Sequence, residues 1–211
     1  MIDPLGGPAY WVPFLIGFVI AYLIGSIPFG LLLAKAGGAG DVRRIGSGNI
    51  GATNVLRTGR KGLALATLAL DMLKGALPVW LGYRYFGPDI AVVAGLGAVV
   101  GHCFPLWLKF RGGKGVATAG GVVAALTPVV ALVVVALFVV IVLLTRYVSL
   151  ASILGALAAG PAAFWLGHFQ AGELYLALAL LIVLKHAGNI RRLLTGQEAK
   201  FGASQPPGSA E

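Results

Sequence analysis

Three short stretches of the sequence concentrate the residues that could bind an anion. The first begins RRIGSGNIGATNVLR at residue 43. Glycine allows a positive φ and a close approach of the backbone to a ligand, and consecutive amides in such a loop form an anion-binding nest. Arg57 could add a bidentate contact to phosphate oxygens. The candidate binding residues of this stretch are Ser47, Gly48, Asn49, Thr53, Asn54, Arg57 and Lys61.

The glycines of this stretch also match a dinucleotide-binding pattern. Gly46, Gly48 and Gly51 are spaced GxGxxG, and Asp71 follows twenty residues later. That fold needs a strand before the glycines and an amphipathic helix after them, whereas apolar segments flank this loop. Asp71 falls inside the second apolar segment, where it can pair with Lys74 on one helix face. A basic loop that rests on anionic lipid is the plainer alternative, but it would not need glycines and amides.

The second stretch, GHCFPLWLKFRGGKGVAT at residues 101–118, places a lysine among glycines just before an apolar helix. A lysine and free backbone amides at a helix N-terminus make an anion site. It is not a Walker A loop, because Leu108 stands where that pattern needs glycine. Lys109 and Arg111 are interpreted as interfacial anchors. The candidate binding residues are Lys114 and the glycines around it, Gly112, Gly113 and Gly115.

The third stretch, KHAGNIRRLLTGQEAKFG at residues 185–202, lies where an apolar segment ends. His186, Asn189 and Arg192 are three residues apart, so they would share one face of a continuing helix. Ser152, with Ser149 close by, is a fourth and weaker element in the sequence RYVSLAS.

Several common catalytic arrangements are absent from the sequence. It contains no HExxH, no GxSxG and no cluster of metal-binding carboxylates, and Asp41 and Glu198 are the only carboxylates near the three stretches. No base and orienting group stand beside a candidate nucleophile. We therefore expect no metal and no cofactor, and a site that positions two anionic or phosphorylated ligands and stabilises their charge.

The composition is that of a polytopic membrane protein. Hydrophobic residues make up 58% of the 211 residues and charged ones 11%, against about 25% charged in soluble domains. Helices are expected, because an open strand edge cannot lie in lipid, and proline should break the longest apolar run before Pro128. The predicted membrane helices are Ala9–Ala34, Leu63–Leu81, Ile90–Leu106, Val116–Leu126, Val129–Leu144, Leu150–Gly167 and Leu174–Leu184.

The basic residues predict how these seven helices cross the membrane. Placing Lys35–Lys61, Lys109–Lys114 and Lys185–Lys200 on the cytoplasmic side, together with Arg146, puts fourteen of the sixteen Lys and Arg residues there. This follows the positive-inside rule, with the N-terminus outside and the C-terminus inside. The net charge of +9 then reflects topology, and no nucleic-acid partner is expected. Residues 1–202 are predicted to form one integral-membrane domain, and residues 203–211 a disordered tail.

Taken together, the three stretches resemble the three motifs of the bacterial membrane acyl-phosphate:glycerol-3-phosphate acyltransferases. GSIPFG at residues 25–30 and DMLKG at residues 71–75 are also similar to family signatures, and the resemblance runs from about residue 13 to 202. It implies seven membrane helices and a site at the cytoplasmic face of the bacterial plasma membrane. It also implies transfer of a fatty acyl group from acyl phosphate to the sn-1 hydroxyl of glycerol 3-phosphate. The products would be lysophosphatidic acid and inorganic phosphate, in the first acylation of phospholipid synthesis.

The resemblance also implies roles for individual residues. Arg57 and Lys114 would clamp phosphates, and His186 would either bind the acceptor phosphate or take its hydroxyl proton; we favour binding. The substrate's own phosphate could then act as the base. We expect a monomer in contact with membrane lipid. The residues expected to take part in catalysis are Ser47, Arg57, Lys114, His186 and Asn189, and those expected to bind substrate are Gly48, Asn49, Thr53, Asn54, Lys61, Gly112, Gly113, Gly115 and Ser152.

Two other functions fit parts of the sequence. Glycine-broken helix ends that face an anion also occur in transporters, but the candidate ligands here lie on one side of the membrane and none lies at its middle. An alcohol phosphotransferase would need several aspartates for divalent metal, which Asp41 and Asp71 do not supply.

Overall fold

The computed structural model describes residues 8–202, and these residues contain helices and no strand. The predicted tail, residues 203–211, lies outside the described residues. The helices are α1 (Pro8–Gly25), α2 (Phe29–Ala36), α3 (Ala52–Leu56), α4 (Lys61–Phe86), α5 (Pro88–Cys103), α6 (Val116–Leu126), α7 (Pro128–Thr145), α8 (Val148–Trp165), α9 (Phe169–Lys185) and α10 (Ala187–Leu194), with short 3₁₀ turns at Val42–Arg44 and Leu106–Leu108.

The first apolar segment contains a break that we did not predict. Helix α1 ends at Gly25 and α2 begins at Phe29, so the single helix expected over Ala9–Ala34 is divided. Pro28 has no N–H to continue the helical ladder. Beside it, the Ile27 carbonyl accepts from the Phe29 N–H over 3.1 Å and from Lys74 Nζ of α4 over 2.9 Å. The whole region from Trp11 to Ala36 is nevertheless apolar and long enough to cross a membrane.

The break before Pro128 is confirmed. Helix α6 is the predicted Val116–Leu126, and α7 begins at Pro128. The Thr127 hydroxyl between them lies 2.7 Å from the hydroxyl of Tyr175 on α9, a buried contact that fixes the turn. With its 11 residues, α6 is about 16 Å long, roughly half of the hydrocarbon core.

Five helical segments of the described chain are long and apolar enough to span a membrane, or six if α9 and α10 count as one bent span. Helix α6 falls short of that length. The third motif does not continue as a straight helix either: the chain bends by 62° between α9 and α10. The bend falls at His186, so Asn189 and Arg192 lie on a helix of their own rather than on an extension of α9.

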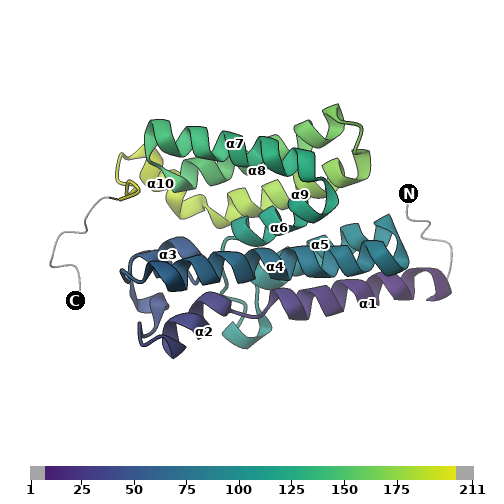
Figure 1. Cartoon of the computed structure of the whole chain (residues 1–211), viewed down its shortest axis with the longest axis horizontal. Helices are drawn as coiled ribbons and strands as arrows, with labels where there is room; N and C mark the ends of the chain where they lie inside the picture. The colour runs from purple at the N-terminus through teal and green to yellow at the C-terminus, as the bar shows by residue number, and fades with distance from the viewer. Residues whose placement is uncertain (1–7, 203–211) are drawn as a thin grey trace.

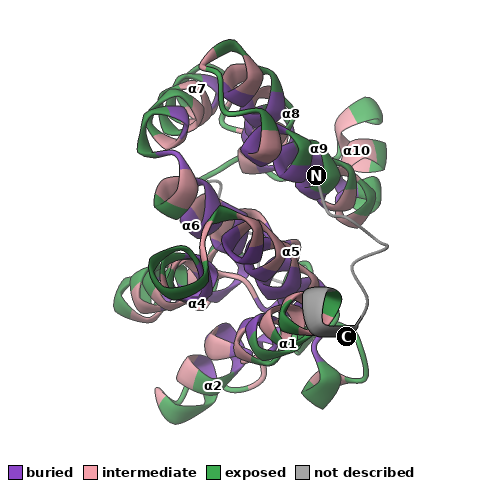
Figure 2. Cartoon of the chain, turned by 90° about the vertical axis from the view of Figure 1, so that its right-hand side faces the viewer, coloured by how far each residue is buried: buried purple, intermediate pink, exposed green. Residues whose placement is uncertain are grey.

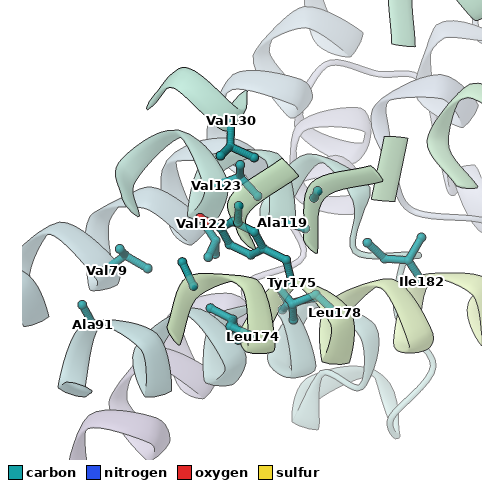
Figure 3. Packing of buried hydrophobic residues seen from close by; sticks show 14 of the residues in the cluster. Val79, Ala91, Ala119, Val122, Val123, Val130, Leu174, Tyr175, Leu178 and Ile182 are labelled. Atoms are coloured by element: carbon teal, nitrogen blue, oxygen red, sulfur yellow. The ribbon is translucent and has the colours of Figure 1, made fainter. Parts of the chain in front are cut away.

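The helices form two groups with α6 between them. Helices α1, α4 and α5 pack on one side and α7, α8 and α9 on the other (Figures 1 and 2). The core between the groups contains Val79, Val122, Leu174 and Tyr175, all buried (Figure 3). Helices α2, α3 and α10 gather at one end of the bundle, opposite the end where α1 begins (Figure 1). The polar residues of the three motifs lie at that end.

Candidate active site

A cavity of about 870 Å³ opens at this end of the bundle. Its lining comes from the first loop, the start of α6, the start of α8, α10 and the segment 197–202. All but three of the predicted site residues line it; the exceptions are Gly48, Gly112 and Gly113. The predicted residues brought together there are Ser47, Asn49, Thr53, Asn54, Arg57, Lys61, Lys114, Gly115, Ser152, His186 and Asn189.

Asn54 organises the first loop from within. Its side chain is buried, and its Nδ2 donates to the carbonyls of Val42 and Asn49, each over 2.7 Å. Its Oδ1 accepts from the backbone N–H of Ser47 over 3.2 Å. Because these hydrogen bonds lie inside the loop, Asn54 holds the loop's shape and has little capacity left for a ligand.

The glycine at position 46 brings the loop against Arg57. Gly46 has φ of +54°, in the left-handed region that favours glycine. A Cβ at this position would lie 2.7 Å from Arg57 Cδ and 2.7 Å from Arg57 Nη1. Any larger residue would push the guanidinium aside. Gly51, the last glycine of the apparent dinucleotide pattern, is extended and precedes α3.

The second loop uses its glycines in another way. We expected the amides of Gly112 and Gly113 to be free for an anion, and this expectation is wrong. The Gly112 N–H donates to the Cys103 carbonyl over 3.2 Å, and the Gly113 N–H donates to the His102 carbonyl over 3.0 Å. These two hydrogen bonds fold the loop back on the end of α5, so its contribution to the cavity begins at Lys114.

A chain of polar contacts joins the second motif to the third. Lys114 Nζ donates to Asn189 Oδ1 over 2.6 Å, and Asn189 Nδ2 donates to Glu198 Oε1 over 2.6 Å. The other carboxylate oxygen of Glu198 accepts from Arg192 Nε over 2.7 Å. The loop before α6, the helix α10 and the segment that follows it are therefore held as one unit.

Burial and neighbouring charges change the protonation of this chain. Burial disfavours the ammonium of Lys114, and Arg192 and Arg57 repel it; Glu198 only partly offsets this, so the pKa of Lys114 falls to about 8. Burial alone would raise the pKa of the Glu198 carboxyl, but its hydrogen bonds and the charge of Arg192 hold that pKa below its usual range. Glu198 is thus an anion within a group of cations at neutral pH.

His186 lies at the bend between α9 and α10 and is buried. Its Nδ1 is 2.8 Å from the Ile182 carbonyl. A carbonyl can only accept, so Nδ1 carries a hydrogen and Nε2 of the neutral ring is an acceptor. Nε2 is therefore the ring nitrogen that can meet a ligand in the cavity.

The cavity lining also contains polar residues that were not among the predicted site residues. Arg192 and Ser149 were noted only as neighbours of predicted residues, and Glu198 only as a nearby carboxylate. Ser149 Oγ is buried and has no hydrogen-bond partner within residues 8–202. The signal for Glu198 was present, since a carboxylate within a strongly basic stretch needs a cationic partner when it is buried. Lys109 and Arg111 are exposed and outside the cavity lining, in line with their interpretation as anchors.

An apolar groove of about 130 Å³ adjoins the polar cavity between α6, α7, α8 and α9. The two share Val116, Phe138 and Ser152, so they meet at the start of α6. Over residues 8–202 we find no group of three His, Cys, Asp or Glu side chains placed to hold a metal ion.

The chain is similar to known proteins over almost all of its length. A family model described as glycerol-3-phosphate acyltransferase matches residues 15–196. A protein of that name from Methylorubrum extorquens (strain PA1) is 54% identical over 195 residues, which are 92% of this chain and 96% of the relative. The crystal structure of PlsY (YgiH), an integral membrane glycerol 3-phosphate acyltransferase, in its glycerol 3-phosphate form has a TM-score of 0.85 at 43% identity, covering 90% of this chain and 96% of that one. Its lysophosphatidic acid form gives 0.83 at 42% identity, covering 90% and 95%.

The fold and the cavity define a multi-pass helical membrane protein with a cation-lined polar site at one end of its bundle. The chain belongs to the glycerol-3-phosphate acyltransferase family. The resemblance inferred from the three motifs is therefore confirmed, and the protein is a membrane-bound acyltransferase.

Proposed function

We propose that the protein transfers a fatty acyl group from acyl phosphate to the sn-1 hydroxyl of glycerol 3-phosphate. The observation that carries this proposal is the meeting of a cation-lined polar cavity with an apolar groove at the start of α6. A small phosphorylated acceptor fits the polar part, and a fatty acyl chain fits the apolar part. The two crystallised forms of the PlsY neighbour, with glycerol 3-phosphate and with lysophosphatidic acid, support this choice of acceptor and product.

In this reaction the acceptor oxygen forms a bond to the acyl carbonyl carbon, and the bond from that carbon to the phosphate oxygen breaks. Negative charge grows on the carbonyl oxygen and the departing phosphate, where Arg57 and Lys114 can stabilise it. Inorganic phosphate leaves without a strong acid, because an acyl phosphate is a mixed anhydride. The hydroxyl proton passes to a phosphate oxygen or to His186.

The hydrogen bond at Nδ1 of His186 determines which protonation state each of its two possible roles, base or phosphate ligand, would need. With Nδ1 bonded to Ile182, the neutral ring can accept a hydrogen bond from the acceptor hydroxyl through Nε2, whereas holding a phosphate requires the protonated ring. If His186 is an obligate base, His186→Ala should lower kcat by about 10²–10⁴. If it only binds substrate, mainly KM should rise.

Other predicted residues act through their neighbours. We assign Asn54 and Gly46 to the positioning of Arg57 and the first loop, and Gly112 and Gly113 to the folding of the second loop. The remaining candidates that line the cavity are proposed to face substrate: Ser47, Asn49, Thr53, Lys61, Gly115, Ser152 and Asn189, with Arg192 added. Gly48, which lies outside the lining and has φ of +68°, is proposed to shape the first loop.

We infer seven membrane crossings, with the N-terminus outside and the C-terminus in the cytoplasm. Helix α6 would complete the count by crossing about half of the core, after which the turn at Thr127 leads into α7. The predicted domain of residues 1–202 would then be one membrane domain. We propose a monomer as the working unit.

Acyl transfer by the purified protein in detergent tests this proposal. Labelled glycerol 3-phosphate is offered with palmitoyl phosphate, acyl-CoA or acyl-carrier protein, with EDTA present throughout. Lysophosphatidic acid from palmitoyl phosphate alone supports the assigned donor. Product from a thioester instead would refute the donor but keep the acyltransferase. A folded protein that forms no product from any donor, yet shows saturable uptake of glycerol 3-phosphate in proteoliposomes, would favour a transporter.

A further inference from the structure

His102 is a buried polar residue that the proposed reaction does not use. It lies in the last turn of α5, next to the second loop, and is 4% exposed. Its side chain lines the polar cavity together with that of Asp71. Its Nδ1 has no hydrogen-bond partner among the described residues.

One edge of the His102 ring faces a buried ion pair. Nδ1 lies 3.7 Å from Asp71 Oδ1, and Lys74 Nζ lies 2.8 Å from the same oxygen. Lys74 also donates to the carbonyl of Ile27, at the break between α1 and α2. The pair is therefore fixed to two helices, and the ring cannot move toward it without displacing charged groups that are buried.

The opposite edge of the ring faces the second loop. A Cβ built on Gly113 would overlap His102 Nε2, with Cε1 2.8 Å and Cδ2 2.9 Å away. The Gly113 N–H also donates to the carbonyl of His102 over 3.0 Å. Both the ring and the backbone of His102 thus contact Gly113, the residue directly before Lys114.

We propose that His102 is a positioning residue for Lys114. Its ring, held against Asp71, forms a rigid surface on which the backbone of Gly113 rests, and this sets where Lys114 begins. Lys114 Nζ is thereby placed 2.6 Å from Asn189 Oδ1 and within the cavity. The inference rests on the proposed function, since it assigns the cause of the position of a phosphate-binding lysine.

A double-mutant cycle between the two residues tests this inference. Gly113→Ala places a methyl group against the ring, so kcat/KM should fall by about tenfold to 100-fold, the cost that a displacement of about 1 Å can have. In a His102→Ala background the ring is gone, and the same substitution should cost less than about twofold. His102→Asn, which ends before the position of Nε2, provides a second background with the same expected rescue.

Two controls separate positioning from loss of fold. Gly62→Ala changes a helical glycine of α4 that has nothing within 4 Å of its added Cβ, and should leave activity unchanged. The melting temperature of Gly113→Ala should fall, because the added methyl overlaps a buried ring, and KM for one phosphate substrate should rise as well. A merely structural role would lower the melting temperature without this change in KM.

The outcomes are distinct. Equal losses from Gly113→Ala in the wild-type, His102→Ala and His102→Asn backgrounds would overturn the inference. A wild type that forms no lysophosphatidic acid would defeat the proposed function instead. Binding of glycerol 3-phosphate and of inorganic phosphate, measured by calorimetry on the same variants, gives the cycle without turnover, so the inference is tested in that case as well.

Discussion

The first and second loops look alike in sequence and differ in construction. Both contain closely spaced glycines and a basic residue that lines the cavity, Arg57 in the first and Lys114 in the second. In the first loop a glycine at positive φ lets Arg57 and Asn54 close over the backbone. In the second loop the glycines allow the backbone to lie against His102 and Pro105. Close packing thus requires glycine at positions 112 and 113, whereas a positive φ favours glycine at Gly46 and, at the end of the second loop, at Gly115.

A glycine-rich stretch therefore does not by itself identify backbone amides as the ligand-binding groups. In the second loop the amides of Gly112 and Gly113 are already bonded to α5. The positive charge of both loops therefore reaches the cavity through side chains, Arg57 from the first and Lys114 from the second. The following predictions test that conclusion, beginning with the largest expected effect.

Lys114→Met should lower kcat/KM by about 10²–10³, the effect of removing one group that stabilises transition-state charge. Methionine keeps the length of the side chain and removes its charge. Lys35→Met, which removes an exposed lysine from the end of α2 outside the cavity, is the matched control. Steady-state kinetics with acyl phosphate measures both. A loss of less than threefold for Lys114→Met would contradict the assignment of Lys114 as the group that carries the charge of the second loop into the cavity.

The pH dependence should follow Lys114. Its pKa is lowered to about 8, chiefly by burial, so the lysine is charged below this pH and neutral above it. The value of kcat/KM for the free enzyme should therefore fall as pH rises, by about tenfold between pH 7 and 9. Lys114→Arg should keep its charge over this range and lose the decline. A profile that is flat in the wild type would contradict the assignment.

Gly46→Ala should lower kcat/KM by about tenfold, through displacement of the Arg57 guanidinium. The matched control is Gly40→Ala: both glycines have positive φ, at +54° and +76°, but Gly40 has nothing within 4 Å of an added Cβ. Backbone strain is common to both variants, so the difference in their kinetics reports the contacts of an added Cβ with Arg57 and with Asn54 Oδ1, which lies 2.8 Å from it. Equal losses in the two variants would assign the effect to strain alone.

Lys61→Gln should have the smallest effect. Lys61 is exposed at the start of α4, on the edge of the cavity, and water and salt screen an exposed charge. We expect KM for glycerol 3-phosphate to rise by about twofold to threefold at low salt, and by less at 0.5 M salt. A larger rise that persists at high salt would place Lys61 in direct contact with substrate.

Local rules predicted much of the fold. The break before Pro128 follows from proline chemistry alone, and the bounds of α6 were predicted correctly. The break after Gly25 also has a local signal, Pro28, which we did not interpret as the end of a helix; the Lys74 side chain that donates to the Ile27 carbonyl beside it comes from 47 residues away. The bend at His186 has no proline to signal it. Features of this kind depend on tertiary contacts that a single segment does not reveal.

The sequence also predicted which kinds of residue form the site. Burying a polar side chain in so apolar a protein costs free energy, so clustered polar residues indicate a function. Most of the predicted residues line one cavity. The sequence could not show whether the donors and acceptors of each residue bond within the protein or face the cavity. Asn54 and Gly113 look like ligands in the motif, yet their bonds are made within the protein. That distinction depends on which atoms face each other after folding.

Because an apolar groove lies beside the polar cavity, the two proposed substrates would reach the site from different phases. Their concentrations are therefore expressed in different units. Glycerol 3-phosphate reaches the enzyme from water, so its supply is counted per litre. A long-chain acyl phosphate, the donor that we propose, would dissolve in the bilayer or micelle and reach the groove from there, so its supply would be counted as a mole fraction of amphiphile. Adding detergent at a fixed amount of donor therefore dilutes one substrate and leaves the other unchanged. In a cell, the rate would depend on the mole fraction of donor in the membrane leaflet that surrounds the enzyme.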